Sequence, residues 1–148
     1  MDAARATDLA ERWERAWNAH DLEAVLALVA DDVVFTSPFA ARVLPGSDGV
    51  LRGKDALRGS WARGLELLPD LHHRVEKVYA GVGTVVLAYR NERGGEVSEV
   101  LELRDGLVVR GHGTYLVRPS SPAARARPPP RLSPPTPATP AGRHPRAA

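Results

Sequence analysis

The chain has 148 residues, of which 43% are apolar and 26% are charged. This length suits one ordinary domain, and the composition is that of a soluble globular protein. The absence of cysteine excludes disulfides and thiolate chemistry. No apolar stretch approaches the roughly 18 uninterrupted residues of a membrane span, and the first residues lack the pattern of a signal peptide. We therefore expect a cytoplasmic protein that does not associate with membranes.

The charge and the prolines divide the chain into two parts. Residues 119–148 contain ten of the 13 prolines, five arginines and no acidic residue. Residues 1–118 then have 15 basic and 18 acidic side chains, a formal net charge of −3. A nucleic-acid-binding domain would need a basic patch on its folded part, so no nucleic-acid partner is expected. We predict a domain over 1–118 and a disordered tail over 119–148, which has too little apolar surface to bury.

The first half of the chain predicts three helices, each with apolar residues recurring at helical spacing. Asp21 is a favourable N-cap for the second helix, and Asp31 and Asp32 would end it. The third would run from about Lys54 to Leu68, and Pro69, which cannot continue a helix, would end it. The apolar stripes are formed by Leu9, Trp13, Ala16 and Trp17, by Leu22, Val25, Leu26 and Val29, and by Leu57, Trp61, Leu65 and Leu68.

Strands are expected after the second helix and throughout the last third of residues 1–118. Residues 33–36 are β-branched and aromatic and predict a strand that ends before Pro38, with a loop over 40–53. Glycine-containing turns separate the later strands, as in antiparallel hairpins. Early helices packed on a later antiparallel sheet indicate the α+β class. The later strands are expected at 72–80, 83–92, 96–104 and 107–117.

Three segments of the chain, Trp17–Ala24, Leu28–Phe35 and Gly53–Leu57, together resemble the nuclear transport factor 2-like superfamily, and within it the SnoaL-like domains. The resemblance covers about residues 5–118. It implies a cone-shaped α+β barrel, with three N-terminal helices packed on a curved, mostly antiparallel sheet around an apolar pocket. The superfamily includes ketosteroid isomerases, polyketide cyclases, epoxide hydrolases, dehydratases and non-catalytic binders, so the fold does not select one reaction.

Most catalytic residues of these relatives have no counterpart at the matching positions. Trp13 stands where ketosteroid isomerases have a tyrosine, and Ser37 stands where they have the general-base aspartate. Glu99 aligns with their second oxyanion-hole acid. The acid–base aspartate of polyketide cyclases falls near Gly113, and His112 would have to replace it. The arginine–aspartate pair of epoxide hydrolases is not discernible.

Strand alternation predicts which side chains face the pocket. If Glu99 points inward, Val109, Gly111, Gly113 and Tyr115 share the inner face of the last strand, and His112 faces outward. Burial would raise the pKa of Glu99, which makes it the first candidate for a catalytic acid. The alternative is an ion pair with Arg90 on the neighbouring strand. His112 is the second catalytic candidate, because imidazole is the usual acid–base group.

The candidate ligand-binding side chains are mainly aromatic, as in most small-molecule pockets. Tyr89 and Asn91 share one face of a strand, but the sequence leaves open which face it is. His72 and His73 point to opposite faces of a strand and have no third ligand at a suitable spacing, so we expect no metal. No motif predicts a cofactor. The ligand-binding candidates are Trp13, Trp17, Phe35, Ser37, Trp61, Tyr89, Asn91 and Tyr115.

Two functions remain open at this point. The first is a SnoaL-like pocket protein for an apolar or carbonyl-bearing small molecule, which as an enzyme would be a cofactor-free isomerase, cyclase or dehydratase using acid–base catalysis. The alternative is a non-catalytic binding or dimerisation domain. In either case we expect a homodimer, because the outer face of the sheet is more apolar than a solvated face requires. That face is expected to include Val100, Val108, His112, Thr114 and Leu116.

Overall fold

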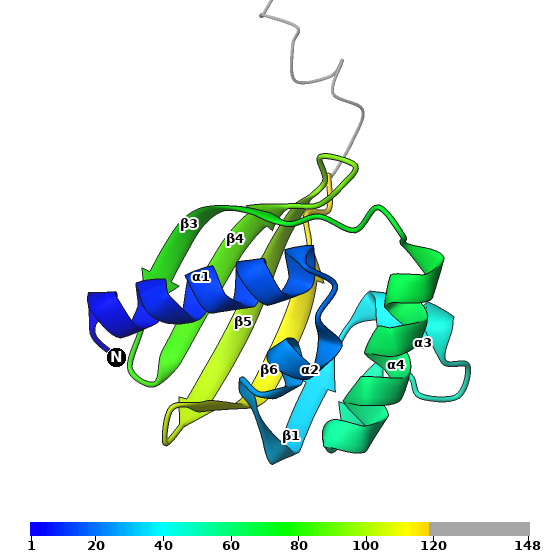
Figure 1. The fold of residues 1–148 in the computed structure, drawn as a ribbon, viewed down its shortest axis with the longest axis horizontal. Coiled ribbons are helices and arrows are strands. Elements are labelled where there is room, and N and C mark those ends of the chain that lie inside the picture. The colour runs from blue at the N-terminus through cyan, green and yellow to red at the C-terminus, as the bar shows by residue number, and fades with distance from the viewer. Residues whose placement is uncertain (119–148) are drawn as a thin grey trace, which may run out of the picture. The chain divides into compact units, whose positions relative to one another are not determined.

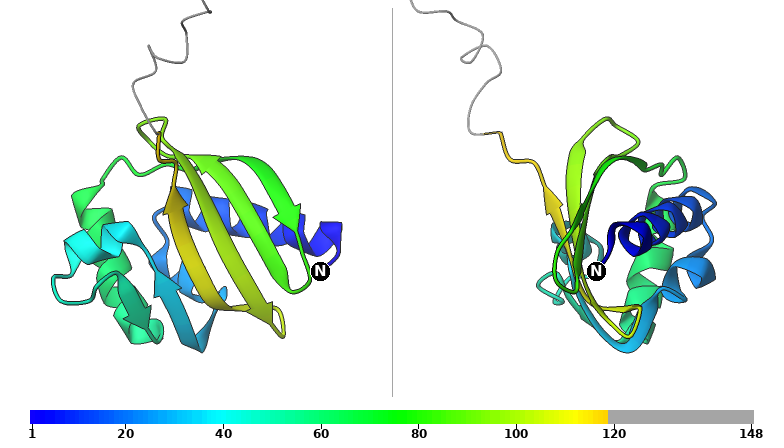
Figure 2. Two further views of the ribbon diagram at one scale, coloured as in Figure 1. Left: turned by 180° about the vertical axis from the view of Figure 1, so that it is seen from behind. Right: turned by 90° about the vertical axis from the view of Figure 1, so that its left-hand side faces the viewer.

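The computed structural model of the protein describes residues 1–118, and the predicted proline-rich tail lies outside them. Three of the four helices lie on one face of a single curved sheet of six strands, and the short helix Pro38–Val43 packs at the end of the sheet beside the helix Lys54–Leu67 (Figures 1 and 2). Within the described residues, no helix is both long enough and apolar enough to cross a bilayer. The elements are α1 (Ala3–Asn18), α2 (Leu22–Leu26), β1 (Val29–Thr36), α3 (Pro38–Val43), β2 (Val50–Arg52), α4 (Lys54–Leu67), β3 (Arg74–Ala80), β4 (Thr84–Arg90), β5 (Glu96–Arg104) and β6 (Leu107–Tyr115).

The sheet has the strand order β2-β1-β6-β5-β4-β3. All neighbouring strands are antiparallel except β1 and β6, which are parallel. The predicted α+β class and the four-stranded meander from β3 to β6 are therefore confirmed. The parallel pair brings a strand from the N-terminal half beside the last strand, so residues far apart in the sequence share one wall of the domain.

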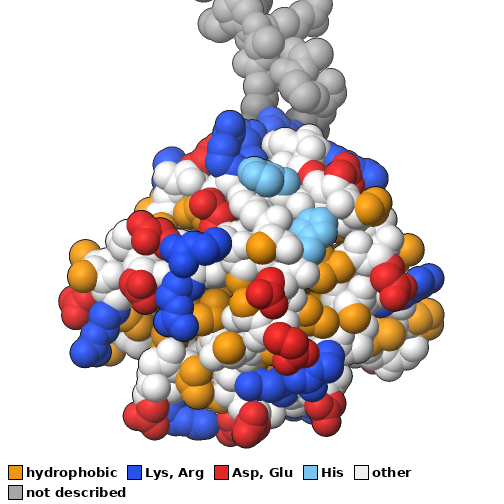
Figure 3. Space-filling model, viewed as in Figure 1, with side chains coloured by type: hydrophobic (Ala, Val, Ile, Leu, Met, Phe, Trp, Pro, Cys, Tyr) orange, Lys and Arg blue, Asp and Glu red, His pale blue; other side chains and the backbone are white. Residues whose placement is uncertain are grey.

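The first helix follows the predicted stripe. Asp2 caps α1 by accepting a hydrogen bond of 2.8 Å from the N–H of Arg5. Leu9, Trp13 and Trp17 are buried against the sheet. Charged side chains on the exposed side of the helices form ion pairs with one another. Basic and acidic groups are intermixed on the face shown in Figure 3.

The second helix is shorter than the sequence predicts. It ends at Leu26, and Val29, Asp31 and Asp32 belong to β1. The pairing of β1 with β6 shifts register between Val29 and Val34, and this irregularity leaves both aspartates exposed. Their carboxylates lie near Lys54 and Arg104. The prediction was wrong because pairing with a distant strand outweighed the local helical pattern.

The stretch predicted as a loop over 40–53 contains two short elements. Ser37 caps α3, since its hydroxyl accepts a 3.1 Å hydrogen bond from the N–H of Phe39, and Pro38 occupies the first helical position. Strand β2 then returns antiparallel to β1. Gly49 has a positive φ of 78°, and a Cβ there would lie 2.8 Å from the Ser37 carbonyl oxygen. Only glycine fits this close approach.

A bulge changes the predicted facing at the start of the last strand. The register between β5 and β6 shifts between Glu102 and Leu103. As a result Val108, predicted on the outer face, is fully buried, and Val109, predicted inside, is only half-buried. Beyond the bulge the predicted alternation holds, with Gly111 and Gly113 on the inner face.

Candidate functional site

A cavity of about 470 Å³ lies between α3, α4 and the inner face of the sheet near the β4–β5 hairpin. One side of it is apolar and largely aromatic, and the other has polar side chains from β4, β5, β6, the N-cap of α3 and the residue before β3. The volume is in the range of small-molecule sites. The apolar side includes Trp17, Phe35, Phe39, Trp61, Leu68 and Leu71, and the polar side includes Ser37, His73, Tyr89, Glu99 and Tyr115.

The aromatic wall is a set of rings in contact. The Trp61 ring lies edge-on to Phe35 and to Trp17, with centroids 5.2 and 5.1 Å apart. Trp13 is fully buried behind these three rings, and it is not among the cavity-lining residues. Three of the predicted aromatic residues therefore both fill the core and line the cavity, whereas Trp13 supports them from behind.

Glu99 is the buried acid of this cavity. Its side chain extends from the inner face of β5, and only 8% of the residue is exposed. Gly113 lies opposite on β6. A Cβ on Gly113 would be 3.6 Å from Glu99 Oε2 and 3.6 Å from Ser37 Oγ, so the missing side chain leaves a niche beside both oxygens. Within residues 1–118, Glu99 Oε2 has no hydrogen-bond partner.

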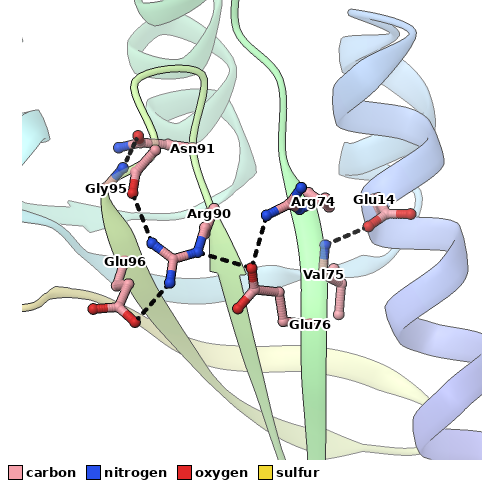
Figure 4. Close-up of polar contacts among 9 residues, drawn as sticks. Glu14, Arg74, Val75, Glu76, Arg90, Asn91, Gly95 and Glu96 are labelled. Atoms are coloured by element: carbon pink, nitrogen blue, oxygen red, sulfur yellow. Dashed lines mark hydrogen bonds and ion pairs between the residues drawn. The ribbon is translucent and has the colours of Figure 1, made fainter.

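Burial raises the pKa of Glu99 to about 7. A base beside it would oppose this effect, but Arg90 lies on the opposite face of the sheet. There the Arg90 guanidinium binds Glu76 at 2.8 Å and Glu96 at 3.3 Å (Figure 4). The alternative in which Arg90 neutralises Glu99 is therefore wrong. At neutral pH the Glu99 carboxyl is present in both its protonated and its ionised form.

Two tyrosines lie next to this acid. Burial, together with the nearby Glu99 carboxylate, raises the pKa of Tyr89 well above its ordinary value. Burial and Glu99 also raise the pKa of Tyr115, whereas a hydrogen bond with Ser37 and the charge of Arg42 oppose the rise. Both phenols stay protonated at neutral pH, so each offers a hydroxyl to a ligand.

His73 is a cavity residue that the sequence argument considered only as a metal ligand and set aside. Its ring stacks on Tyr89 with centroids 4.2 Å apart, and its main chain is held by Asn18 through hydrogen bonds of 2.7 and 2.8 Å. Burial lowers the pKa of His73 to about 4, so the imidazole is neutral at pH 7. Alternation counted back from Val75 would have placed this histidine inside. Residues 1–118 contain no group of three or more potential metal ligands.

The remaining candidates lie around the cavity or outside it. Asn91 lines the rim, where its side-chain oxygen accepts hydrogen bonds from the N–H groups of Arg93 and Gly95 and closes the β4–β5 hairpin. His112 lies on the other side of β6, with Nδ1 hydrogen-bonded to the Thr36 hydroxyl at 2.6 Å, and does not line the cavity. Arg42, Glu92 and Arg93 form a charged rim that no sequence pattern predicted.

Comparisons with known proteins agree with this architecture. The model of the family described as SnoaL-like domain matches residues 10–113. A SnoaL-like protein of unknown function from Burkholderia thailandensis E264 is 35% identical, with a TM-score of 0.74 over 79% of this chain and 99% of that one. The chain therefore belongs to the SnoaL-like family of the nuclear transport factor 2-like superfamily, as its resemblance predicted.

Two further solved structures share the fold at lower identity. IdmH from Streptomyces antibioticus, a candidate polyketide cyclase, is 20% identical, with a TM-score of 0.63 over 74% of this chain and 91% of that one. TerC, co-crystallised with polyporic acid, is 16% identical, with a TM-score of 0.63 over 75% of this chain and 91% of that one. A comparison with curated proteins found no match.

Proposed function

We propose that this protein binds a small, mostly apolar molecule that carries a carbonyl group, with its rings against Trp17 and Trp61 and its oxygen directed at Glu99. The observation that carries the proposal is the Glu99 carboxyl, buried in the cavity wall with no hydrogen-bond partner on Oε2 among the described residues. A buried polar atom without a partner costs free energy that a ligand would recover. Ligand binding by TerC and the reaction named for IdmH support a small-molecule role for this fold.

The chemistry that fits Glu99 is proton transfer without a cofactor. In its protonated form the carboxyl donates a hydrogen bond to a carbonyl oxygen, and in its ionised form it accepts a proton from the adjacent carbon. A pKa of about 7 makes both forms available near neutral pH. Isomerisation, cyclisation and dehydration are the reaction classes that need such a group. The phenols of Tyr89 and Tyr115 would stabilise the negative charge that develops on the oxygen.

A non-catalytic binding domain is the second candidate. The observation that favours it is the lack of a second acid–base group with a pKa near neutrality in the described cavity wall. His73 has a pKa of about 4, and the pKa values of both tyrosines are raised. Glu99 would then orient a bound carbonyl without transferring a proton.

Two bicyclic probes test the proposal, namely 2-tetralone, which has a ketone and acidic α-hydrogens, and tetralin, which has the same rings without oxygen. At pH 6 we expect 2-tetralone to bind about tenfold more tightly than tetralin, because protonated Glu99 donates a hydrogen bond to the ketone. This preference should decline as the pH rises through 7. It should become independent of pH in Glu99→Gln and remain unchanged in Glu11→Gln, where an exposed acid outside the cavity is replaced. Calorimetric titration measures both affinities.

The same ketone separates an enzyme from a binder. If Glu99 transfers protons, the protein accelerates exchange of the α-hydrogens of 2-tetralone with D₂O, and Glu99→Gln abolishes the acceleration. Nuclear magnetic resonance follows the exchange directly. Binding without accelerated exchange would favour the non-catalytic domain. Failure of both probes to bind would overturn the proposed function.

A further inference from the structure

The rim of the cavity has an excess of positive charge. Arg42 comes from α3, and Arg93 and Glu92 come from the β4–β5 hairpin, so two separate segments place charged side chains around one opening. Glu92 is the acidic group among these three, which leaves a formal net charge of +1 at the rim. The apolar rings of Trp17 and Trp61 lie on the wall beside it.

Neither rim arginine is neutralised by an acidic partner in the part of the chain that the structure describes. Other exposed arginines do have such partners: Arg58 pairs with Glu23 at 3.0 Å, and Arg104 pairs with Asp32 at 3.1 Å. The guanidinium carbon of Arg42 instead lies 5.7 Å from the centroid of the Phe39 ring, which itself lines the cavity. A cation–π contact thus holds Arg42 against the cavity wall and leaves its N–H groups for another acceptor.

Arg42 is also connected to the polar side of the cavity. Its charge and the Ser37 hydroxyl both lower the pKa of Tyr115 against the effect of burial, and Ser37 borders the niche of Glu99 beside Gly113. Polar groups therefore extend from the rim to the buried carboxyl, beside the aromatic wall. A flat molecule lying on that wall would have one edge along these groups, with one end at Glu99 and the other at Arg42.

We propose that the ligand is a flat aromatic acid whose carboxylate binds Arg42 and Arg93 at the rim while its rings lie against Trp17 and Trp61. This inference rests on the proposed function and adds the class of ligand. Guanidinium groups match a carboxylate through paired hydrogen bonds. At the rim the anion stays partly hydrated, which avoids the cost of burying a charge. The ionisable Glu99 would repel an anion placed deeper, so the two ends of the cavity fix one orientation.

The test compares 2-naphthoate with 2-naphthamide, which has the same rings and an uncharged amide. At pH 7 and low salt we expect wild-type protein to bind 2-naphthoate about tenfold more tightly, as for hydrogen bonds between charged groups. Arg42→Gln and Arg93→Gln should each weaken 2-naphthoate binding by about 3-fold to 10-fold and leave 2-naphthamide unchanged. Added sodium chloride should reduce the difference between the two ligands.

Two further variants make the test specific. Glu92→Gln removes the acidic group of the rim and should tighten 2-naphthoate binding, in the direction opposite to the arginine variants. Arg52→Gln removes an exposed cation on β2, outside the cavity, and should have no effect. Equal affinity of both ligands in the wild type, or an equal loss with Arg52→Gln, would overturn the carboxylate site while leaving the cavity function intact. If neither ligand binds although 2-tetralone does, this inference fails and the cavity function stands; if 2-tetralone and tetralin also fail to bind, both fail.

Discussion

Glu99 and His73 are both buried in the cavity wall, and burial moves their pKa values in opposite directions. For each group the charged form is disfavoured, because it loses hydration that the protein does not replace. The pKa of Glu99 rises to about 7 from 4.5, whereas that of His73 falls to about 4 from 6.5. Each change corresponds to about 3 kcal/mol between the two protonation states.

These two residues should therefore give opposite slopes of stability with pH. The folded state retains the Glu99 proton above pH 4.5, where the unfolded chain loses it. The stability associated with neutral Glu99 is therefore complete at low pH and is lost as the pH rises to about 7. The contribution of neutral His73 is complete above pH 6.5 and is lost as the pH falls to about 4. The free energy of unfolding of Glu99→Gln, relative to that of wild type, should therefore increase by about 3 kcal/mol as the pH rises from 4 to 8. For His73→Phe the same difference should increase by a similar amount as the pH falls from 7 to 4.

Urea denaturation of the three proteins at matched pH values measures this prediction. Glu11→Gln serves as the control, because its side chain is exposed on α1. A parallel pH dependence in wild type and both variants would show that neither group titrates differently in the folded and unfolded states.

At the scale of single elements, the two glycines of β6, Gly111 and Gly113, have different structural roles. A Cβ at Gly111 would lie 2.1 Å from Cε2 of the Phe35 ring, so the buried ring or the strand would have to shift. A Cβ at Gly113 would meet its nearest atoms at 3.6 Å, which is ordinary contact. Gly111 is therefore required for packing against β1, and Gly113 shapes the niche next to Glu99.

We predict that Gly111→Ala destabilises the fold by about 1–3 kcal/mol, the usual cost of overfilling a core. Gly113→Ala should retain wild-type stability within about 0.5 kcal/mol, since nothing needs to move. The same variant should weaken 2-tetralone binding, because the added methyl group occupies the niche. Thermal unfolding and titration with 2-tetralone distinguish the two effects. Equal stability losses in both variants would contradict this division of tasks.

At the scale of the whole molecule, the outer face of the sheet bears an apolar row that crosses four strands. Tyr79, Val86, Val100 and His112 are successive cross-strand partners on β3, β4, β5 and β6. Within residues 1–118 no helix covers this part of the sheet, as the left view of Figure 2 shows. The predicted interface keeps Val100 and His112 but loses Val108, which the bulge places in the core.

We predict that the protein forms a homodimer through this row, because a two-fold axis would bring the row against its own copy. His112→Asp would place a charge at that contact and should shift sedimentation at micromolar concentration toward the monomer. Glu11→Lys on the opposite, helical side of the sheet should leave the dimer intact. A monomeric wild type would contradict the dimer, and a dimer unaffected by His112→Asp would place the interface elsewhere.

Periodicity in the sequence was sufficient for the main elements, whereas the inward position of Glu99 was suggested by the family resemblance and alternation gave only the facing of its neighbours. The stripe of α1 and the alternation of β5 follow from fixed backbone repeats, which are visible in any local window. The family resemblance added the expectation of a pocket. The resemblance placed Ser37 among the ligand-binding candidates, and strand alternation placed Tyr115 there and left the facing of Tyr89 open; all three residues line the cavity.

Only the tertiary structure decided the features that depend on residues distant in the sequence. The parallel pairing of β1 with β6 turned Asp31 and Asp32 from a helix end into an exposed part of a strand. His73 is held by Asn18, 55 positions earlier, and the charged rim combines α3 with the β4–β5 hairpin. Local patterns fix which face of an element is apolar. Burial, bulges and the meeting of distant side chains are set by packing, which stabilises contacts that no single segment encodes.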